Sequence, residues 1–508
     1  MADYDLVVRG GLVASGVGTM RCDIGIRGGR IVALAESITD GAATLDAGGL
    51  LVLPGGVDSH CHIEEPARGG YVGTGGDLAV TVNEESFRTA STSAFAGGTT
   101  SVVCFVPQWK GEGILPRLAD YEQRAAKGML DYSFHQIISD PTDEVLEREV
   151  PQIVARGIRS LKVFLTYEPL HLSDEQFLKV LATARRHGCL VTVHCENYAA
   201  IKWRTEMLIK AGMTAPKYHA WSRPVVVERE ATHRAIALAE LVDQPIQVFH
   251  VSCAEAAEEI ARAQHRGLKV WGETCPQYLT LTAADMDRPG FEGAAYMCSP
   301  SPRTEAEQGR VWEMIRRGTL DVVSSDHCGF SMAGEAGKAA NGRDAPFRDI
   351  PNGIPGLAAR LPILFSEGVS KGRISLEHFV RLTATNPARL MGLAPRKGAI
   401  AIGADADLAL WDPKKRVTIA NPLMQHAIDY TPYEGLEVTG WPVATVRRGE
   451  VVMRDGVVQG EPGTGQFLPR GPYDFIAPRG VLADGFDAAP RGRAQPSSTA
   501  GRPVTKRQ

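Results

Sequence analysis

A pair of histidines near the start of the chain, His60 and His62, has the spacing of a metal site. Both stand in the stretch VDSHCH, at the end of an apolar run that we expect to form a β-strand. Side chains two positions apart on a strand point to the same face, so both imidazoles can reach one ion. Two histidines alone are a weak indication, because histidines also serve as ordinary core or surface residues. Further ligands from elsewhere in the chain are needed.

Polar residues at or near the ends of other apolar runs supply candidates for these ligands. Lys162 lies in SLKVFLTY, His194 in CLVTVHCE, His250 in PIQVFHVS and Asp326 in LDVVSSDH. Three or more imidazole nitrogens with carboxylates suit zinc, and iron, manganese or cobalt are possible replacements. The pattern therefore predicts a metal centre that is assembled from several strands.

Lys162 needs an interpretation of its own, because it stands inside an apolar strand. Burying an ammonium group is costly, and an ammonium cannot ligate a metal. In one interpretation the side chain extends along the strand end to solvent. In the other, the amine has reacted with carbon dioxide, and the resulting carbamate bridges two metal ions through its two oxygens. Composition and spacing leave both interpretations open.

The elements that must position these residues alternate between strands and helices. Helical spacing of apolar residues is clear in DEQFLKVLATARRHG and in AEAAEEIARAQHRG, which ends at Gly267. Eight apolar runs are expected to be strands: LVLPGGVDSHCH, TTSVVCFV, DYSFHQII, IRSLKVFLTY, CLVTVHCE, PIQVFHVS, LKVWGETC and LDVVSSDH. This alternation predicts an α/β fold with a parallel (β/α)8 barrel, in which active sites form at the carboxyl ends of the strands.

The two ends of the chain share a different texture, with short β-rich runs separated by glycine pairs. We therefore expect residues 1–52 and 396–465 to form one discontinuous β-sandwich domain, and residues 53–395 to form the barrel. Residues 466–483 follow as a separate C-terminal extension. The tail, residues 484–508, is rich in Pro, Gly, Ser and Arg and is expected to be disordered.

Composition narrows the class of protein. The chain has 508 residues, a net charge of -4, 44% hydrophobic residues and 22% charged residues, which is typical of a globular protein with neither nucleic acid nor a membrane as partner. Nine cysteines without a disulfide pattern indicate free thiols in a reducing compartment. The first residues do not resemble a signal peptide, and no apolar run is long enough to span a membrane, so we expect a cytoplasmic protein.

A series of motifs then resembles one family closely. In chain order these are VDSHCH, LKVFLTY, VHCEN, YHAWSRP, EATHRAI, FHVSCAEA, WGETCPQYLTLT, CSPSPR, SSDHCGF, IPNGIPG and TATNPARLMGL. They look like the dihydropyrimidinase and D-hydantoinase family of cyclic amidohydrolases, over residues 3 to about 470. The resemblance implies hydrolysis of a ring amide, with hydantoins and dihydropyrimidines opened to N-carbamoyl amino acids.

The resemblance also implies the roles of individual residues. His60, His62 and Asp326 would bind one divalent metal ion, and His194 and His250 a second, with zinc the favoured metal. Lys162 would be the carbamylated bridge between the two ions. Asp326 would act as general base and then acid, and Tyr167 would hydrogen-bond the substrate carbonyl. Backbone groups at two further positions, Ser299 and Asn352, would hold the ring amide.

The loop after the two histidines departs from the family. D-hydantoinases commonly continue HxHLDMPFGG, with apolar residues around the exocyclic substituent, whereas this chain has HIEEPARGG. In one interpretation Glu65 and Arg68 simply face water. In the other, Arg68 approaches a carboxylate or polar group of the substrate. Phe164 and Tyr167 would still provide aromatic walls.

Related activities and assembly follow from the same resemblance. An allantoinase or dihydroorotase, or a cyclic imide hydrolase, is the alternative enzyme. A non-catalytic scaffold is the alternative outside enzymes, although such relatives typically lack several metal ligands. The family is usually tetrameric or dimeric, and its C-terminal extension often packs on a neighbouring subunit. The resemblance therefore implies a homotetramer or homodimer in which residues 466–483 contact a neighbour.

Overall fold

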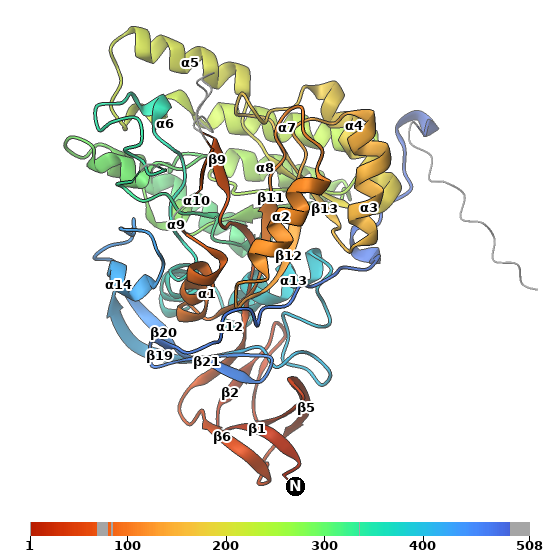
Figure 1. The fold of residues 1–508 in the computed structure, drawn as a ribbon, viewed down its shortest axis with the longest axis vertical. Helices are drawn as coiled ribbons and strands as arrows, with labels where there is room; N and C mark the ends of the chain where they lie inside the picture. The colour runs from red at the N-terminus through yellow and green to blue at the C-terminus, as the bar shows by residue number, and fades with distance from the viewer. Residues whose placement is uncertain (1, 69–79, 83–84, 335, 488–508) are drawn as a thin grey trace, which may run out of the picture.

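A closed parallel barrel forms the centre of the molecule (Figure 1). The computed structural model describes residues 2–68, 80–82, 85–334 and 336–487. The strand order is β17-β16-β15-β14-β13-β12-β11-β8-β18, and β17 and β18 are two pieces of the eighth strand: β17 pairs with β16, and β18 pairs with β8. The barrel strands are β8 (Gly56–His62), β11 (Thr99–Val106), β12 (Asp131–Ile137), β13 (Ser160–Phe164), β14 (Leu190–His194), β15 (Ile246–Val248), β16 (Val270–Thr274), β17 (Leu320–Val323) and β18 (His327–Cys328). The predicted α/β barrel is confirmed.

The strands are apolar on both faces because helices cover the outside while side chains fill the inside. Every residue of β8, β11, β12, β13 and β14 is buried. Parallel strands covered in this way read as continuous hydrophobic runs. A polar residue inside such a run is therefore unusual and needs a partner or a function.

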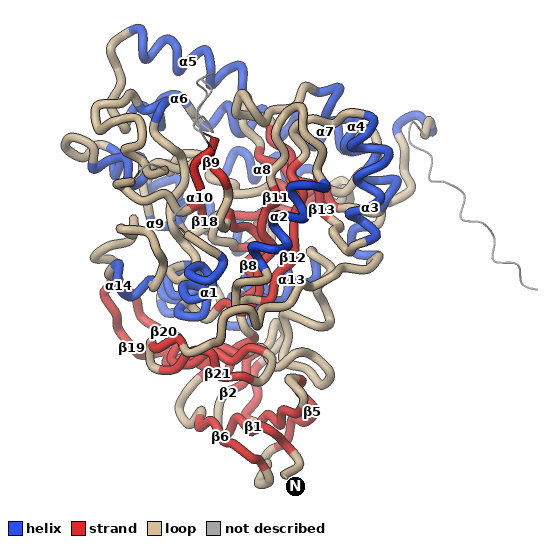
Figure 2. The backbone as a smooth tube through the Cα atoms, viewed as in Figure 1, coloured by secondary structure: helices blue, strands red, loops and turns tan. Residues whose placement is uncertain are grey.

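Helices follow the barrel strands and surround them (Figure 2). The predicted helix DEQFLKVLATARRHG is α4, which begins after an N-cap at Ser173 and ends at Gly188 in the left-handed conformation (φ 65°). The α-helices are α1 (Phe87–Ala96), α2 (Leu115–Ala125), α3 (Val150–Ala155), α4 (Asp174–His187), α5 (Tyr198–Lys210), α6 (Tyr218–Ser222), α7 (Val225–Leu241), α8 (Ala254–His265), α9 (Gln277–Thr280), α10 (Glu305–Arg316), α11 (Arg360–Leu364), α12 (Leu376–Val380), α13 (Asn386–Leu390) and α14 (Asn421–Met424).

Both ends of the chain contribute to the β-rich region at one end of the molecule (Figure 1). One sheet has the order β22-β21-β20-β19-β7-β2-β3 and the other β5-β4-β1-β6. Their strands are β1 (Tyr4–Arg9), β2 (Leu12–Ala14), β3 (Thr19–Arg21), β4 (Asp23–Arg27), β5 (Arg30–Ala35), β6 (Gly41–Asp46), β7 (Leu51–Pro54), β19 (Leu408–Thr418), β20 (Glu437–Arg447), β21 (Glu450–Arg454) and β22 (Val457–Val458). One apolar cluster joins the two sheets, with Ile24 and Leu45 from one and Leu408 and Val446 from the other.

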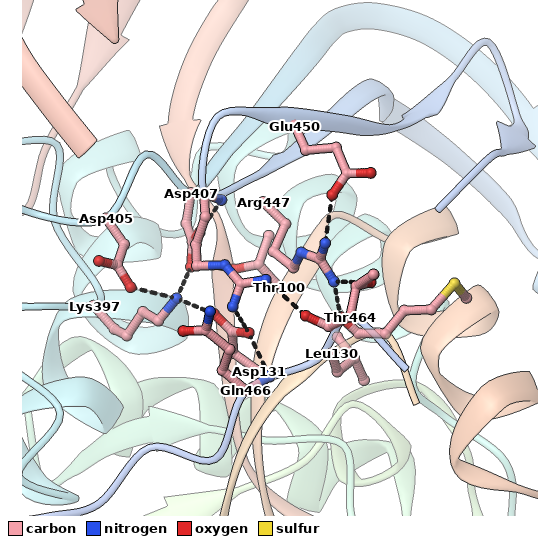
Figure 3. Close-up of polar contacts among 12 residues, drawn as sticks. Thr100, Leu130, Asp131, Lys397, Asp405, Asp407, Arg447, Glu450, Thr464 and Gln466 are labelled. Atoms are coloured by element: carbon pink, nitrogen blue, oxygen red, sulfur yellow. Dashed lines mark hydrogen bonds and ion pairs between the residues drawn. The ribbon is translucent and has the colours of Figure 1, made fainter. Parts of the chain in front are cut away.

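A buried group of charges lies where the barrel meets this β-rich region (Figure 3). Lys397 Nζ is 2.6 Å from Asp131 Oδ2, 3.0 Å from Asp405 Oδ2 and 2.7 Å from Asp407 Oδ2. Arg448 Nη1 is 2.8 Å from the other oxygen of Asp131, the first residue of β12. We call this group the base cluster, since β12 begins there. It joins the amino end of a barrel strand to the segments around β19 and β20.

The C-terminal extension packs on the barrel of its own chain. Leu468 N donates to Tyr132 O at 2.7 Å, and Arg470 N donates to Gly157 O at 2.9 Å. The Arg470 guanidinium is buried and donates to Ser160 Oγ at 3.0 Å. Contact of residues 466–483 with a neighbouring subunit stays a prediction.

The start of the tail differs from the expected disorder. Residues Ala483–Gly485 form a 3-10 turn, and the Asp487 carboxylate pairs with the buried Arg185 guanidinium. The segment that ends at Asp487 is ordered because its carboxylate is an anionic partner for the buried guanidinium of Arg185. Residues 488–508 lie outside the described part of the chain.

The cysteines agree with the expectation of free thiols. All nine cysteines are free thiols; eight are buried and Cys328 is half-buried. Among the described residues, no helix combines the length and the apolar character that crossing a bilayer would require.

Candidate active site

The residues singled out from the sequence converge at the carboxyl ends of the barrel strands. His60 and His62 lie on β8, Lys162 on β13, and His194 is the last residue of β14. His250 follows β15 by two residues, and Asp326 lies between β17 and β18. One cavity is lined by all six, together with Glu65, Phe164, Tyr167, Ser299 and Asn352.

Three of these side chains form the tightest group. His60 Nε2 is 3.0 Å from Asp326 Oδ1, and His62 Nε2 is 3.7 Å from the same oxygen. Their ligand atoms all lie within 4.8 Å of one another. Two imidazoles and a carboxylate that converge in this way can hold one divalent ion.

The other two histidines complete the far side of the cavity. The ring centroids of His194 and His250 are 4.2 Å apart, and those of His60 and His250 are 5.3 Å apart. Burial, and then neighbouring positive groups, holds the pKa of His60, His194 and His250 well below the ordinary value. The rings are therefore neutral near pH 7, which is the form that binds metal.

Three glutamates stand behind three of the histidines. Glu273 Oε1 lies 2.6 Å from His60 Nδ1, Glu65 Oε2 lies 2.5 Å from His62 Nδ1, and Glu196 Oε2 lies 2.7 Å from His194 Nε2. A carboxylate on one ring nitrogen fixes the tautomer and directs the other nitrogen at a metal. Glu273 and Glu196 were not among the residues predicted from the sequence. A glutamate inside the apolar run LKVWGETC was the available signal for Glu273.

Lys162 is fully buried beside the histidines, which excludes the interpretation that its amine extends to solvent. Its Nζ has no hydrogen-bond partner within the described residues and lies 4.4, 4.7 and 5.4 Å from the ring centroids of Phe249, Phe164 and Phe105. Burial lowers the pKa of Lys162 to about 8, against the opposing effect of Asp326. An amine in these surroundings exists partly in its neutral, nucleophilic form.

The backbone is strained at three positions around the cavity. Tyr167, His250 and Asp326 have φ angles of 67°, 42° and 48°, a region that residues other than glycine rarely adopt. Such conformations cost roughly 1–3 kcal/mol each and cluster at functional sites. They turn these side chains sharply off the preceding elements and into the cavity.

Tyr167 is held by buried neighbours. Its phenol has a pKa raised by burial, so it stays protonated and able to donate a hydrogen bond. The Arg223 guanidinium lies 5.3 Å from the Tyr167 ring centroid, and it also contacts Glu196 at 2.6 Å. Arg223 lies in the YHAWSRP motif, and so does His219. His219 is buried, with Nε2 2.9 Å from Cys298 O and 3.4 Å from Ser299 Oγ.

A buried lysine holds together the two loops that carry Ser299 and Asn352. Lys338 Nζ donates to Met297 O at 3.1 Å and to Pro351 O at 3.0 Å. Met297 O also accepts from Gly353 N at 3.0 Å. Lys338 is fully buried, and burial lowers its pKa to about 7. Neither the sequence motifs nor the spacing pointed to this residue.

The first acidic residues of the loop after His62, Glu64 and Glu65, point largely into the protein. Glu65 is only 7% exposed and its carboxylate contacts His62, so the interpretation in which Glu65 faces water is wrong. The physical reason is that the imidazole offers a buried donor close by. Arg68 belongs to β9 (Pro66–Arg68), which pairs with β10 (Val80–Val82), but its side chain lies outside what the structure describes. Phe164 lines the cavity as an aromatic wall.

Two further buried histidines, His135 and His327, have hydrogen-bond partners outside the ligand group. His327 contacts the Glu85 carboxylate, and its Nδ1 accepts from Gly356 N at 3.0 Å. His135 lies beside Ser59 O (2.9 Å) and Ser160 Oγ (2.6 Å) inside the barrel. Both rings are used in packing and hydrogen bonding.

Comparison with known proteins gives the class that this barrel and site define. Residues 51–452 match the amidohydrolase family. The chain belongs to this family, whose members depend on metal ions, and the group of His60, His62 and Asp326 fits that dependence.

Within the family, similar proteins include D-hydantoinases. The D-hydantoinase of Ralstonia pickettii is 41% identical over 471 residues, which is 92% of this chain and 99% of that protein. The D-hydantoinase of Geobacillus stearothermophilus is 41% identical over 474 residues, 92% of this chain and 97% of that protein. The crystal structure of dihydropyrimidinase from Brevibacillus agri superposes with a TM-score of 0.87 at 40% identity, covering 92% of this chain and 99% of that one. The resemblance found in the motifs is confirmed.

Proposed function

We propose that this chain is a metal-dependent hydrolase that opens the ring of cyclic amides. Hydantoins and 5,6-dihydropyrimidines are the proposed substrates and N-carbamoyl amino acids the products. One observation carries the proposal: four histidines, a buried lysine and an aspartate line one cavity in a chain 41% identical to D-hydantoinases.

The side chains in the cavity fit two divalent ions, with zinc the favoured metal. His60, His62 and Asp326 would hold one ion, His194 and His250 the other, and Lys162 would contact both. Support comes from buried atoms that lack partners: among the described residues, neither Lys162 Nζ nor His250 Nδ1 has a hydrogen-bond partner. Divalent ions at such a site polarise a carbonyl and generate a nucleophile from water at neutral pH.

Lys162 would act as a carbamate. In this step the neutral amine would attack the carbon of carbon dioxide, forming a C–N bond while one C=O π bond opens to place its electron pair on oxygen. The nitrogen would then release one proton to water, which leaves a carbamate anion with two oxygens. The pKa of about 8 supports the step, because an appreciable fraction of the amine is neutral near physiological pH.

The remaining residues would handle the amide. Asp326 would take a proton from the attacking water and return it to the leaving nitrogen as the C–N bond breaks. Tyr167 would donate to the carbonyl oxygen as negative charge develops there. Backbone groups at Ser299 and Asn352 would hold the ring, and Lys338 supports this role because it ties both loops together.

Organisation beyond the site is also part of the proposal. The two sheets that share an apolar cluster would form a β-sandwich domain from residues 1–52 and 396–465, with the barrel between them at 53–395. The protein would act in the cytoplasm as a homotetramer or homodimer, with the extension at 466–483 reaching a neighbour. Free cysteines support a reducing compartment.

A substrate panel tests the function. Purified protein would be assayed with hydantoin, both enantiomers of 5-phenylhydantoin, dihydrouracil, allantoin, dihydroorotate and succinimide, with metal content measured on the same preparation. We expect bound metal and turnover of hydantoins or dihydrouracil. Turnover confined to allantoin, dihydroorotate or the imide would replace the proposed substrate class. A protein with neither metal nor turnover would be a scaffold.

A further inference from the structure

We propose that Glu65 is a positioning residue that orients His62 toward the metal and makes metal affinity depend on the loop after β8. This inference rests on the proposed function, in which His62 is a ligand. It concerns the residue at which this chain departs from the methionine of the family's HxHLDMPFGG motif.

The contact between the two side chains is close and buried. Glu65 Oε2 lies 2.5 Å from His62 Nδ1, and the two residues are 7% and 9% exposed. The opposite ring nitrogen, Nε2, faces the cavity at 3.7 Å from Asp326 Oδ1. With Nδ1 bonded to the carboxylate, the proton sits on Nδ1 and the lone pair on Nε2, which is the arrangement that a ligand requires.

Two other histidines of the site also contact a glutamate carboxylate, but those glutamates lie on or next to barrel strands instead of on a loop. Glu273, behind His60, lies in β16, and Glu196, behind His194, follows β14 by two residues. Both therefore stand on or next to barrel strands. Glu65 stands instead on the segment between β8 and the β9–β10 ribbon.

The position of Glu65 on a loop makes its contact with His62 depend on the conformation of that loop. A strand-borne carboxylate holds its histidine whatever the substrate does. A loop-borne carboxylate holds His62 only while the loop keeps its position beside the cavity, and Glu65 itself lines that cavity. Contact between a substrate and this loop would then change the basicity and orientation of a metal ligand.

The neighbouring acid supplies a matched control. Glu64 Oε2 accepts from Phe87 N at 3.1 Å, and Glu64 Oε1 lies 3.7 Å from Arg124 Nη1. Its carboxylate is thus used at the start of α1 and beside α2, away from the histidines. Glu64→Gln removes one charge from the same loop without touching His62.

The test measures zinc binding rather than activity. Metal-free wild type, Glu65→Met, Glu65→Gln and Glu64→Gln would be titrated with zinc in competition with a chromogenic chelator, and the thermal midpoint of each metal-free protein would be recorded. We expect Glu65→Met to bind zinc about 10–100-fold more weakly than wild type, with Glu65→Gln between them and Glu64→Gln unchanged. The metal-free midpoints should agree, since Glu65→Met introduces the family's own residue.

A double-mutant cycle separates positioning from other roles. In a His62→Ala background, Glu65→Met should cause no further loss of zinc affinity, because the residue acts through that ring. Zinc affinity of Glu65→Met within twofold of wild type, or an equal loss in both backgrounds, would overturn the inference while leaving the hydrolase intact. Failure of the wild type itself to bind zinc would instead overturn the proposed function.

Discussion

The barrel contains two buried groups of charge at its opposite ends, and they are satisfied to different degrees. In the base cluster, Lys397 has three carboxylate partners, and Asp131 Oδ1 also accepts from Gln466 N (Figure 3). Arg448 Nη1 pairs with the same Asp131 oxygen. In the cavity at the carboxyl ends of the strands, Lys162 Nζ has no hydrogen-bond partner among the described residues. Three non-glycine residues around that cavity also have positive φ angles.

The difference separates a structural role from a chemical one. A buried ion pair whose members are all partnered holds elements together, whereas unpartnered and strained groups are tolerated where a ligand will complete them. Both groups contain a fully buried lysine. The partners, and not the residue type, therefore tell the two roles apart.

The largest expected effect is at the cavity lysine. Lys162→Ala should reduce hydrolysis on the order of 10³-fold or more and lower the metal content, because it removes the proposed bridge and with it the activated water. Steady-state kinetics and elemental analysis measure both. Partial rescue by acetate or propionate would support the carbamate. Normal metal content and full activity in Lys162→Ala would show that this lysine has no role in metal binding or hydrolysis.

At the base, Lys397→Met should destabilise the fold by about 3–5 kcal/mol, because three buried carboxylates lose their shared cation. Denaturant unfolding measures the change. In contrast, Arg148→Met, at an exposed pair with Glu144, should cost less than about 1 kcal/mol. Folded Lys397→Met should keep wild-type metal content. A selective loss of metal would contradict the purely structural role given to the base cluster.

Tyr167→Phe tests whether a residue of the cavity acts in the reaction without contributing to the stability of the fold. Removing one donor to the developing oxyanion should lower kcat about 10²–10³-fold. The unfolding midpoint should stay near that of wild type, since the ring and its packing against Arg223 remain. An unchanged kcat would remove Tyr167 from the reaction.

The smallest effect is expected at Lys338, a buried lysine beside the cavity whose Nζ donates to two backbone carbonyls. Lys338→Met should raise KM by roughly tenfold with a smaller change in kcat, because two buried carbonyls lose a donor and the loops carrying Ser299 and Asn352 separate. Lys338→Arg should retain part of the function. A loss confined to kcat would argue against a role in holding the substrate.

The sequence was most informative where a feature is local. The run TTSVVCFV matches β11 from Thr99 to Val106, and the spacing of His60 and His62 places both rings at one cavity. Interactions between distant segments were not predictable in the same way. The base cluster joins Asp131 to Lys397, Asp405 and Asp407, which are far apart from it in the chain.

Glu65 shows a second limit of prediction from the sequence. Local composition favoured a charged loop facing water, but burial depends on the partner, and His62 was available to it. Glu273 and Glu196 were missed for the same reason, since their importance lies in contacts with His60 and His194. Propensity and periodicity describe one segment at a time, whereas a carboxylate–imidazole pair depends on two.

The seven-stranded sheet also constrains how the protein is made. Leu53 of β7 pairs with Ala409 of β19, about 350 residues later in the chain. At roughly 5–20 residues per second, a ribosome needs about 20–70 s to synthesise the intervening segment. During this time the early strands β2, β3 and β7 are without their C-terminal partners, while the barrel between them emerges and can fold. Until β19 has been synthesised, the backbone groups of β7 that pair with it are unpaired and can bind strands of other chains.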